Sequence, residues 1–156
     1  LKSLKVTDRE SEASIYAIEN NGNGTYRMSD ESGNPINDVS QDKIISYLQF
    51  FSSINYEMEE RSLSQHQRDS IRAAVPFRSI TLIKNDGTST SIDLWRRPQL
   101  SSTVNKTNEA GQPYLYDIDR MTAKFQGDTN LIVVQYFSFE KLFRRIPDFT
   151  NNPVVK

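Results

Sequence analysis

Apolar residues alternate with polar ones in two stretches of the chain, and turn-forming residues interrupt each stretch. In residues 14–28 the interruption is the Asn- and Gly-rich segment 20–24, and in residues 79–94 it is Asn85-Asp86-Gly87. Alternation places every second side chain on the same face of a strand, so both stretches are predicted to be β-hairpins. Because the Asp-Gly pair suits positive φ angles, we expect a primed turn in the second hairpin.

Three segments have apolar residues at helical spacing. Ser40 precedes the first set, which predicts a capped amphipathic helix that ends near Ser53 and covers a sheet with its apolar face. Residues 64–74 are predicted to form a polar-faced helix that stops before Pro76. The third set is closed by Pro147 and consists of Phe139, Leu142, Phe143 and Ile146.

The remaining segments supply a short strand, a third hairpin and a loop. Residues 56–59 alternate as a short strand does. Residues 116–125 and 131–136 flank Gln126-Gly127-Asp128 and are predicted to form the third hairpin. Residues 98–113 have no periodicity, which is typical of a long surface loop.

The first two hairpins resemble one another. The stretch that starts at Ser14 is echoed by the one that starts at Ser79, and each is followed later by a helix. The echo indicates two similar ββα-like units, about residues 1–75 and 76–156, within one domain that spans residues 1–156. We therefore predict an α+β fold in which antiparallel β-hairpins form the sheet and helices pack on one face.

Composition narrows the class of protein. A chain of 156 residues buries roughly 70% of its unfolded surface, which is enough for an independent core. Nineteen basic and twenty acidic residues create no field that would attract nucleic acid. The absence of cysteine excludes disulfides, thiolate zinc sites and cysteine nucleophiles. The longest aliphatic run, residues 131–134, is far shorter than the roughly 20 residues of a membrane-spanning helix.

Few residues indicate chemistry. Segment 20–24 supplies no carboxylate and lacks the third glycine of a dinucleotide loop, so we interpret it as a turn and not as a calcium or phosphate site. His66 is the only histidine, which excludes multi-histidine metal sites, and its polar neighbours favour a solvated helix surface over a serine triad. We predict no catalytic residue, no cofactor-binding residue and no metal site.

Asp117 and Asp119 are the strongest enzymatic candidates. On a regular strand they would share one side and could act as paired acid and base. Arg120, Arg96 or Arg97 could equally neutralise them, and we favour a structural ion pair or a turn cap. Three nearby carboxylates are interpreted as the solvated side of the short strand: Glu57, Glu59 and Glu60.

Aromatic residues offer a carbohydrate or peptide platform, although aromatics at strand and helix spacing usually belong to the core, which is the interpretation we favour. The candidates are Trp95, Tyr114, Tyr116, Tyr136, Phe137 and Phe139. The period changes from strand to helix within residues 135–143, so we predict a junction that serves the core. The doublets Arg96-Arg97 and Arg144-Arg145 are too few for a nucleic-acid stripe.

The motifs Tyr116-Asp117-x-Asp119-Arg120 and Gln135-Tyr136-Phe137-x-Phe139 are the most specific pieces of a resemblance that extends over nearly the whole chain and includes the order of its segments. The resemblance is to a group of exported or lipid-anchored Bacteroidota proteins that share a domain of unknown function. It implies an extracytoplasmic location and anchoring through a missing N-terminal segment, in line with a chain that begins at Leu1 rather than Met. It defines no catalytic residue.

These observations favour a non-enzymatic extracytoplasmic binding or accessory module whose partner is an unknown protein or small ligand. The main alternative is a surface hydrolase or carbohydrate-active protein that uses Asp117 and Asp119. A second alternative, which depends on loose likeness alone, is a periplasmic accessory domain of an ABC-type exporter.

Overall fold

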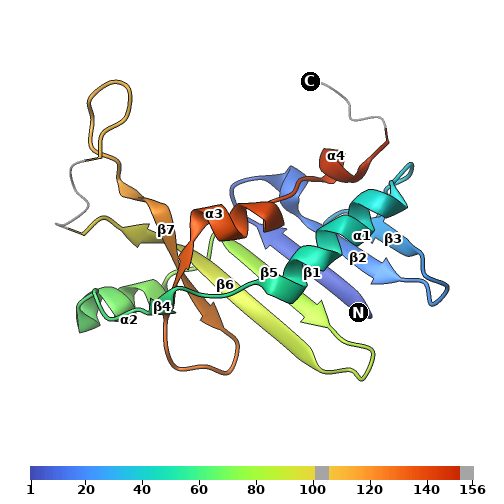
Figure 1. The fold of residues 1–156 in the computed structure, drawn as a ribbon, viewed down its shortest axis with the longest axis horizontal. Coiled ribbons are helices and arrows are strands. Elements are labelled where there is room, and N and C mark those ends of the chain that lie inside the picture. The colour runs from blue at the N-terminus through green and yellow to red at the C-terminus, as the bar shows by residue number, and fades with distance from the viewer. Residues whose placement is uncertain (101–105, 152–156) are drawn as a thin grey trace.

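The computed structural model describes residues 1–100 and 106–151. Eight antiparallel strands form a single sheet in the order β3-β2-β1-β5-β6-β7-β8-β4 (Figure 1). The strands are β1 (Ser3–Asp8), β2 (Tyr16–Asn20), β3 (Tyr26–Ser29), β4 (Met58–Glu59), β5 (Arg78–Ile83), β6 (Ser89–Pro98), β7 (Tyr116–Phe125) and β8 (Ile132–Gln135). The helices are α1 (Gln41–Phe50), α2 (Gln65–Ala73), α3 (Tyr136–Phe139) and α4 (Ile146–Phe149), with 3-10 turns η1 (Glu12–Ser14), η2 (Phe51–Ser53) and η3 (Glu140–Leu142).

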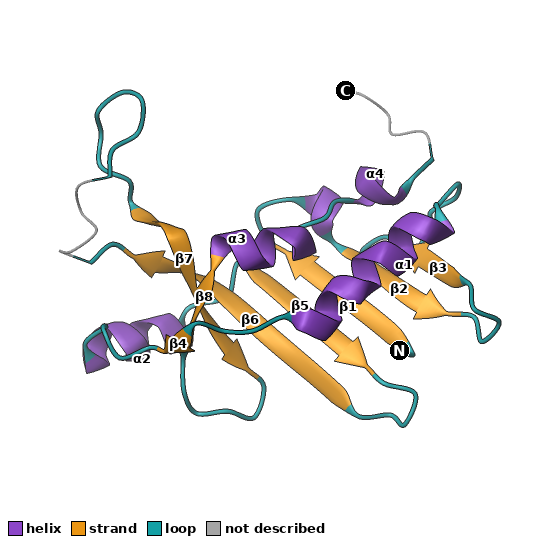
Figure 2. Cartoon of the chain, in the orientation of Figure 1, coloured by secondary structure: helices purple, strands orange, loops and turns teal. Residues whose placement is uncertain are grey.

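The predicted α+β class with antiparallel hairpins is confirmed. Helices α1, α3 and α4 cover one face of the sheet (Figure 2), where Ile44, Phe139 and Phe149 join the main hydrophobic core. Helix α2 packs against the opposite face. Trp95 follows the core residue Leu94 on β6, so its side chain points to that opposite face and contacts α2 there. A second, smaller cluster forms there and comprises Leu63, Ile71, Trp95 and Leu131.

All three predicted hairpins form, as β2-β3, β5-β6 and β7-β8. The primed turn predicted for the second hairpin is wrong. Among the described residues Asp38 is the one non-glycine with positive φ, so Asp86 does not have the conformation that a primed turn requires. Gly87 alone adopts it in this turn, at φ 86°, while Lys84 N–H donates to Thr88 O at 2.8 Å. The turn is therefore one residue longer than the primed type. The descent of the two hairpins from a duplicated unit stays a prediction.

Helix α1 begins where the sequence predicts, since the Ser40 hydroxyl accepts the Lys43 N–H. Helix α2 is closed at its start by a capping box formed by Ser64 and Gln67. The short strand and the long loop differ from expectation: β4 has only two residues, and Pro98 belongs to β6. In the loop, Thr107 pairs with Pro113, while residues 101–105 lie outside the described part.

The C-terminal helical stripe is split, which corrects the prediction that Pro147 closes it. The chain leaves helical geometry at Phe143, and Pro147 lies in the first turn of a new helix, α4. Proline suits that position because the first turn does not need its missing N–H. The predicted strand-to-helix junction is confirmed: β8 ends at Gln135, and Phe139 of α3 is buried in the main core.

The free edge of β3 is covered by a side chain. The Gln41 amide accepts the Tyr26 N–H at 2.8 Å and donates to the Tyr26 carbonyl at 2.9 Å. Gln41 thus replaces a neighbouring strand at that residue, which blocks pairing with another chain there.

Candidate functional site

A bulge interrupts β7 at the segment that contains Asp117 and Asp119. Tyr116 pairs with Pro98, but the next paired residue of β7 is Met121, opposite Arg96. One residue of β6, Arg97, therefore faces four residues of β7. The Asp117 carboxylate accepts the N–H groups of residues 119 and 120 at 2.9 and 3.1 Å, which satisfies backbone donors that the bulge leaves without strand partners.

The bulge separates the two aspartates. A regular strand would place Asp117 and Asp119 on one side, but the extra residues break that alternation. Asp117 is buried, whereas Asp119 is half exposed and pairs with Lys106. The sequence suggested a turn cap or an ion pair for these carboxylates, and Asp117 makes both contacts.

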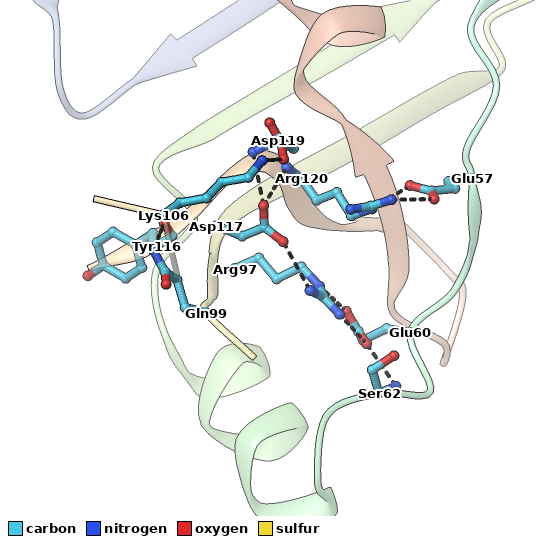
Figure 3. Close-up of polar contacts among 10 residues, drawn as sticks. All are labelled: Glu57, Glu60, Ser62, Arg97, Gln99, Lys106, Tyr116, Asp117, Asp119 and Arg120. Carbon is cyan, nitrogen blue, oxygen red and sulfur yellow. Dashed lines mark hydrogen bonds and ion pairs between the residues drawn. The ribbon is translucent and has the colours of Figure 1, made fainter. Parts of the chain in front are cut away.

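Arg97 is the cation that binds Asp117, and it also binds Glu60 (Figure 3). Its Nε and Nη2 contact the two Glu60 oxygens at 2.7 and 3.1 Å, and Nη1 contacts Asp117 Oδ2 at 3.2 Å. All three side chains are at least 96% buried. The Ser62 N–H also donates to Glu60. The prediction that Glu60 lies on the solvated side of its strand is wrong, because the chain turns inward there and Glu60 pairs with Arg97.

The two other predicted partners of the aspartates bind glutamates instead: Arg96 pairs with Glu10, and Arg120 pairs with Glu57. The Arg120 Nε and Nη2 donate to the two Glu57 oxygens at 2.8 and 3.0 Å. The hydrogen bond from Arg120 holds the pKa of Glu57 below its ordinary value of 4.5. Together with Arg97, this pair fastens residues 57–60, including β4, to the sheet (Figure 3).

A second buried ion pair, which was not predicted from the sequence, joins Asp8 of β1 to Arg78 of β5. These residues stand opposite one another in the sheet. The Arg78 guanidinium also lies 4.4 Å from the centre of the Phe143 ring. Beside it, the Tyr16 hydroxyl donates to the Tyr47 hydroxyl, which donates to the Leu142 carbonyl.

An aromatic hollow of about 430 Å³ lies where β6 ends and β7 begins. We call it the α2–β7 hollow; it is lined by Gln67, Ser70, Ile71, Ala74, Val75, Phe77, Trp95, Arg96, Pro98 and Tyr116. The Trp95 indole is fixed by a 2.9 Å hydrogen bond to the Ala74 carbonyl. Val75 and Tyr116 stand at the rim, with 59% and 43% of their surface exposed. Two of the aromatic residues considered as a platform, Trp95 and Tyr116, therefore meet at one hollow.

The other sequence candidates lie elsewhere. Phe139 is buried in the core, Phe137 is exposed on α3, and His66 is exposed on α2. A larger hollow, of about 850 Å³, has a mainly polar lining that includes Asp8 and Glu10, and both are already paired with arginines. Within residues 1–100 and 106–151, no group of three or more His, Asp or Glu side chains is arranged to hold a metal.

Comparison with known proteins adds no relative. No protein-family model matches the chain, and neither a curated protein nor a solved structure does. None of the helices in the described part combines the length and hydrophobicity needed to cross a bilayer.

Proposed function

We propose that the domain is a non-enzymatic binding module that acts outside the cytoplasm and engages a partner protein through the α2–β7 hollow. The observation that carries the proposal is the hollow itself, where Phe77, Trp95 and Tyr116 meet beside Arg96. Aromatic and arginine side chains contribute more binding energy at protein interfaces than other residue types do. The extracytoplasmic part of the proposal depends on the resemblance to exported Bacteroidota proteins.

The exposed apolar surface continues beyond the hollow along the chain. Leu115 is 79% exposed and directly precedes Tyr116 at the rim. Exposed apolar side chains that form a contiguous patch are typical of a protein interaction surface. A protein partner is therefore favoured over a small ligand, which is usually enclosed on most sides by its pocket.

The hydrolase alternative is less well supported by the geometry. A pair of catalytic carboxylates must reach the substrate, and one must exchange protons with it. Asp117 is instead buried against Arg97 and two backbone amides. Asp119 is accessible but is paired with Lys106.

Site-specific photo-cross-linking in the native host tests the proposal. A cross-linking residue at Val75, on the rim, should form a covalent adduct with one protein. The same residue at Lys84, at the far end of strands β5 and β6, is the control and should not form it. Tyr116→Ala should reduce the Val75 adduct, and equal adducts at Val75 and Lys84 would contradict the proposal.

Fluorescence and activity measurements separate the alternatives. Trp95 is the only tryptophan, so its emission reports whether the hollow is occupied. Adding the purified cross-linked partner should shift that emission in the parent protein and less in Tyr116→Ala. Hydrolysis of a glycoside or ester panel that is lost in both Asp117→Asn and Asp119→Asn would instead establish the enzymatic function.

A further inference from the structure

The turn between β2 and β3 contains both Asn-Gly sequences of the chain, Asn21-Gly22 and Asn23-Gly24. Asparagine is a chemically labile residue. When glycine follows, its backbone nitrogen attacks the asparagine side chain readily, because glycine has no side chain to hinder the approach. All four residues are exposed, so the sequence and exposure alone do not distinguish the two asparagines.

The hydrogen bonds around Asn23 favour this reaction. Its Oδ1 accepts the Thr25 N–H at 3.2 Å and the Thr25 hydroxyl at 2.6 Å. A bond from a side-chain oxygen to the N–H two residues later folds the side chain over the intervening Gly24 peptide. Two donors on Oδ1 also draw electron density from Cγ, the atom that is attacked. The Gly24 N–H makes no hydrogen bond with residues 1–100 or 106–151, so its proton is available to solvent.

The hydrogen bonds around Asn21 oppose the same reaction. The Gly22 N–H, which would have to lose its proton, donates to Asn20 Oδ1 at 2.8 Å. The Asn21 side chain is directed across the turn, where its Nδ2 donates to Thr25 Oγ1 at 3.0 Å. Both the attacking nitrogen and the attacked group are therefore engaged elsewhere.

We propose that Asn23 is a site of spontaneous deamidation and that the turn protects Asn21. Hydroxide removes the Gly24 amide proton and becomes water, and the nitrogen forms a bond to Asn23 Cγ. The Cγ–Nδ2 bond then breaks as Nδ2 takes a proton from water and leaves as ammonia, which regenerates hydroxide. Water then opens the cyclic imide at either carbonyl and yields aspartate or isoaspartate, with no oxidation or reduction. The product adds a carboxylate to the hairpin, which lies at the opposite end of the sheet from α2 (Figure 1). The proposal is thus independent of the binding function.

Mass spectrometry of the intact folded protein, aged at mildly alkaline pH and then digested, tests the proposal. Fragmentation that distinguishes isoaspartate from aspartate should locate the product at Asn23. The product should form there several-fold faster than at Asn21. In denaturant both Asn-Gly sequences lose their hydrogen bonds, so the two rates should become nearly equal.

The variant Asn20→Ala provides a matched test, because it removes the acceptor that holds the Gly22 N–H. The rate at Asn21 should rise towards that at Asn23, while the rate at Asn23 should remain unchanged if the hairpin is intact. Equal rates in the folded parent protein, or faster reaction at Asn21, would overturn the proposal. A rate ratio that persists in denaturant would also overturn it, since the folded turn would not be its cause.

Discussion

Replacing Arg97 with methionine tests how strongly one guanidinium holds the buried charges of the sheet. The substitution keeps a long apolar stem but removes the cation between Glu60 and Asp117. Both carboxylates are almost fully buried, and Arg97 is the cation that contacts both of them. Arg97→Met therefore leaves two buried negative charges without a bound cation.

The expected loss is large because the carboxylates cannot regain water without moving. Removing one partner of a buried ion pair typically costs about 3–5 kcal/mol. At about 2–4 °C per kcal/mol for a domain of this size, the melting temperature should fall by about 6–20 °C. The loss is a substantial part of a typical stability of about 5–15 kcal/mol.

Thermal and urea unfolding followed by circular dichroism measure this loss. Arg61→Met is the control, because Arg61 makes an ion pair with Glu59 in which both side chains are largely exposed, and it should change the melting temperature little. Adding Glu60→Gln to Arg97→Met should restore part of the stability by removing one stranded charge. If Arg97→Met and Arg61→Met lower the melting temperature equally, Arg97 does not stabilise the buried carboxylates.

Four further substitutions test the core and the pH dependence of stability. Phe139→Ala should cost about 3–5 kcal/mol, whereas His66→Ala should change the melting temperature little; equal effects would contradict the burial of Phe139. Burial raises the pKa of Tyr47 from 10.0 to about 12, so stability should fall as pH rises between these values, and Tyr47→Phe should lessen that slope in urea titrations. The hydrogen bond from Arg120 lowers the pKa of Glu57, so ionised Glu57 stabilises the folded state above pH 4.5 and this stabilisation is lost as pH falls through the lowered pKa. If Glu57→Gln leaves the slope of unfolding free energy against acidic pH unchanged, this reasoning is refuted.

Hydrophobic periodicity predicted most elements of this fold, but it missed strand β1 and several element ends. The alternation around residues 14–28 and 79–94 reflects contacts within one hairpin, which neighbouring residues determine. Turn type was not predictable in the same way: Asp86-Gly87 suits a primed turn, yet only Gly87 takes positive φ. Pro147 stops one helix pattern and equally suits the start of another, so its position alone does not separate the two outcomes.

The sequence singled out Asp117 and Asp119 as candidate residues, but it did not predict their geometry. Asp117 and Asp119 were paired by assuming a regular strand, but a bulge separates them and Asp117 contacts Arg97 of the neighbouring strand. Glu60 was assigned to solvent because a period-two pattern does not show that the chain turns inward after β4. Buried ion pairs are contacts between elements, and no local pattern in one element encodes its partner.

The aromatic residues of the α2–β7 hollow also show that a local sequence pattern does not reveal contacts between elements. Tyr16 and Tyr116 both occupy strand positions, yet the first is 1% exposed and the second 43%. Tyr16 lies on β2, between β1 and β3, and α4 packs against its ring through Phe149. Tyr116 begins β7 four residues before the pairing with β8 starts at Arg120, so no strand of the described residues flanks it on that side. Exposure at a strand end is therefore set by where neighbouring elements stop, and aromatic residues at such ends are candidates for binding even where their spacing is typical of a core.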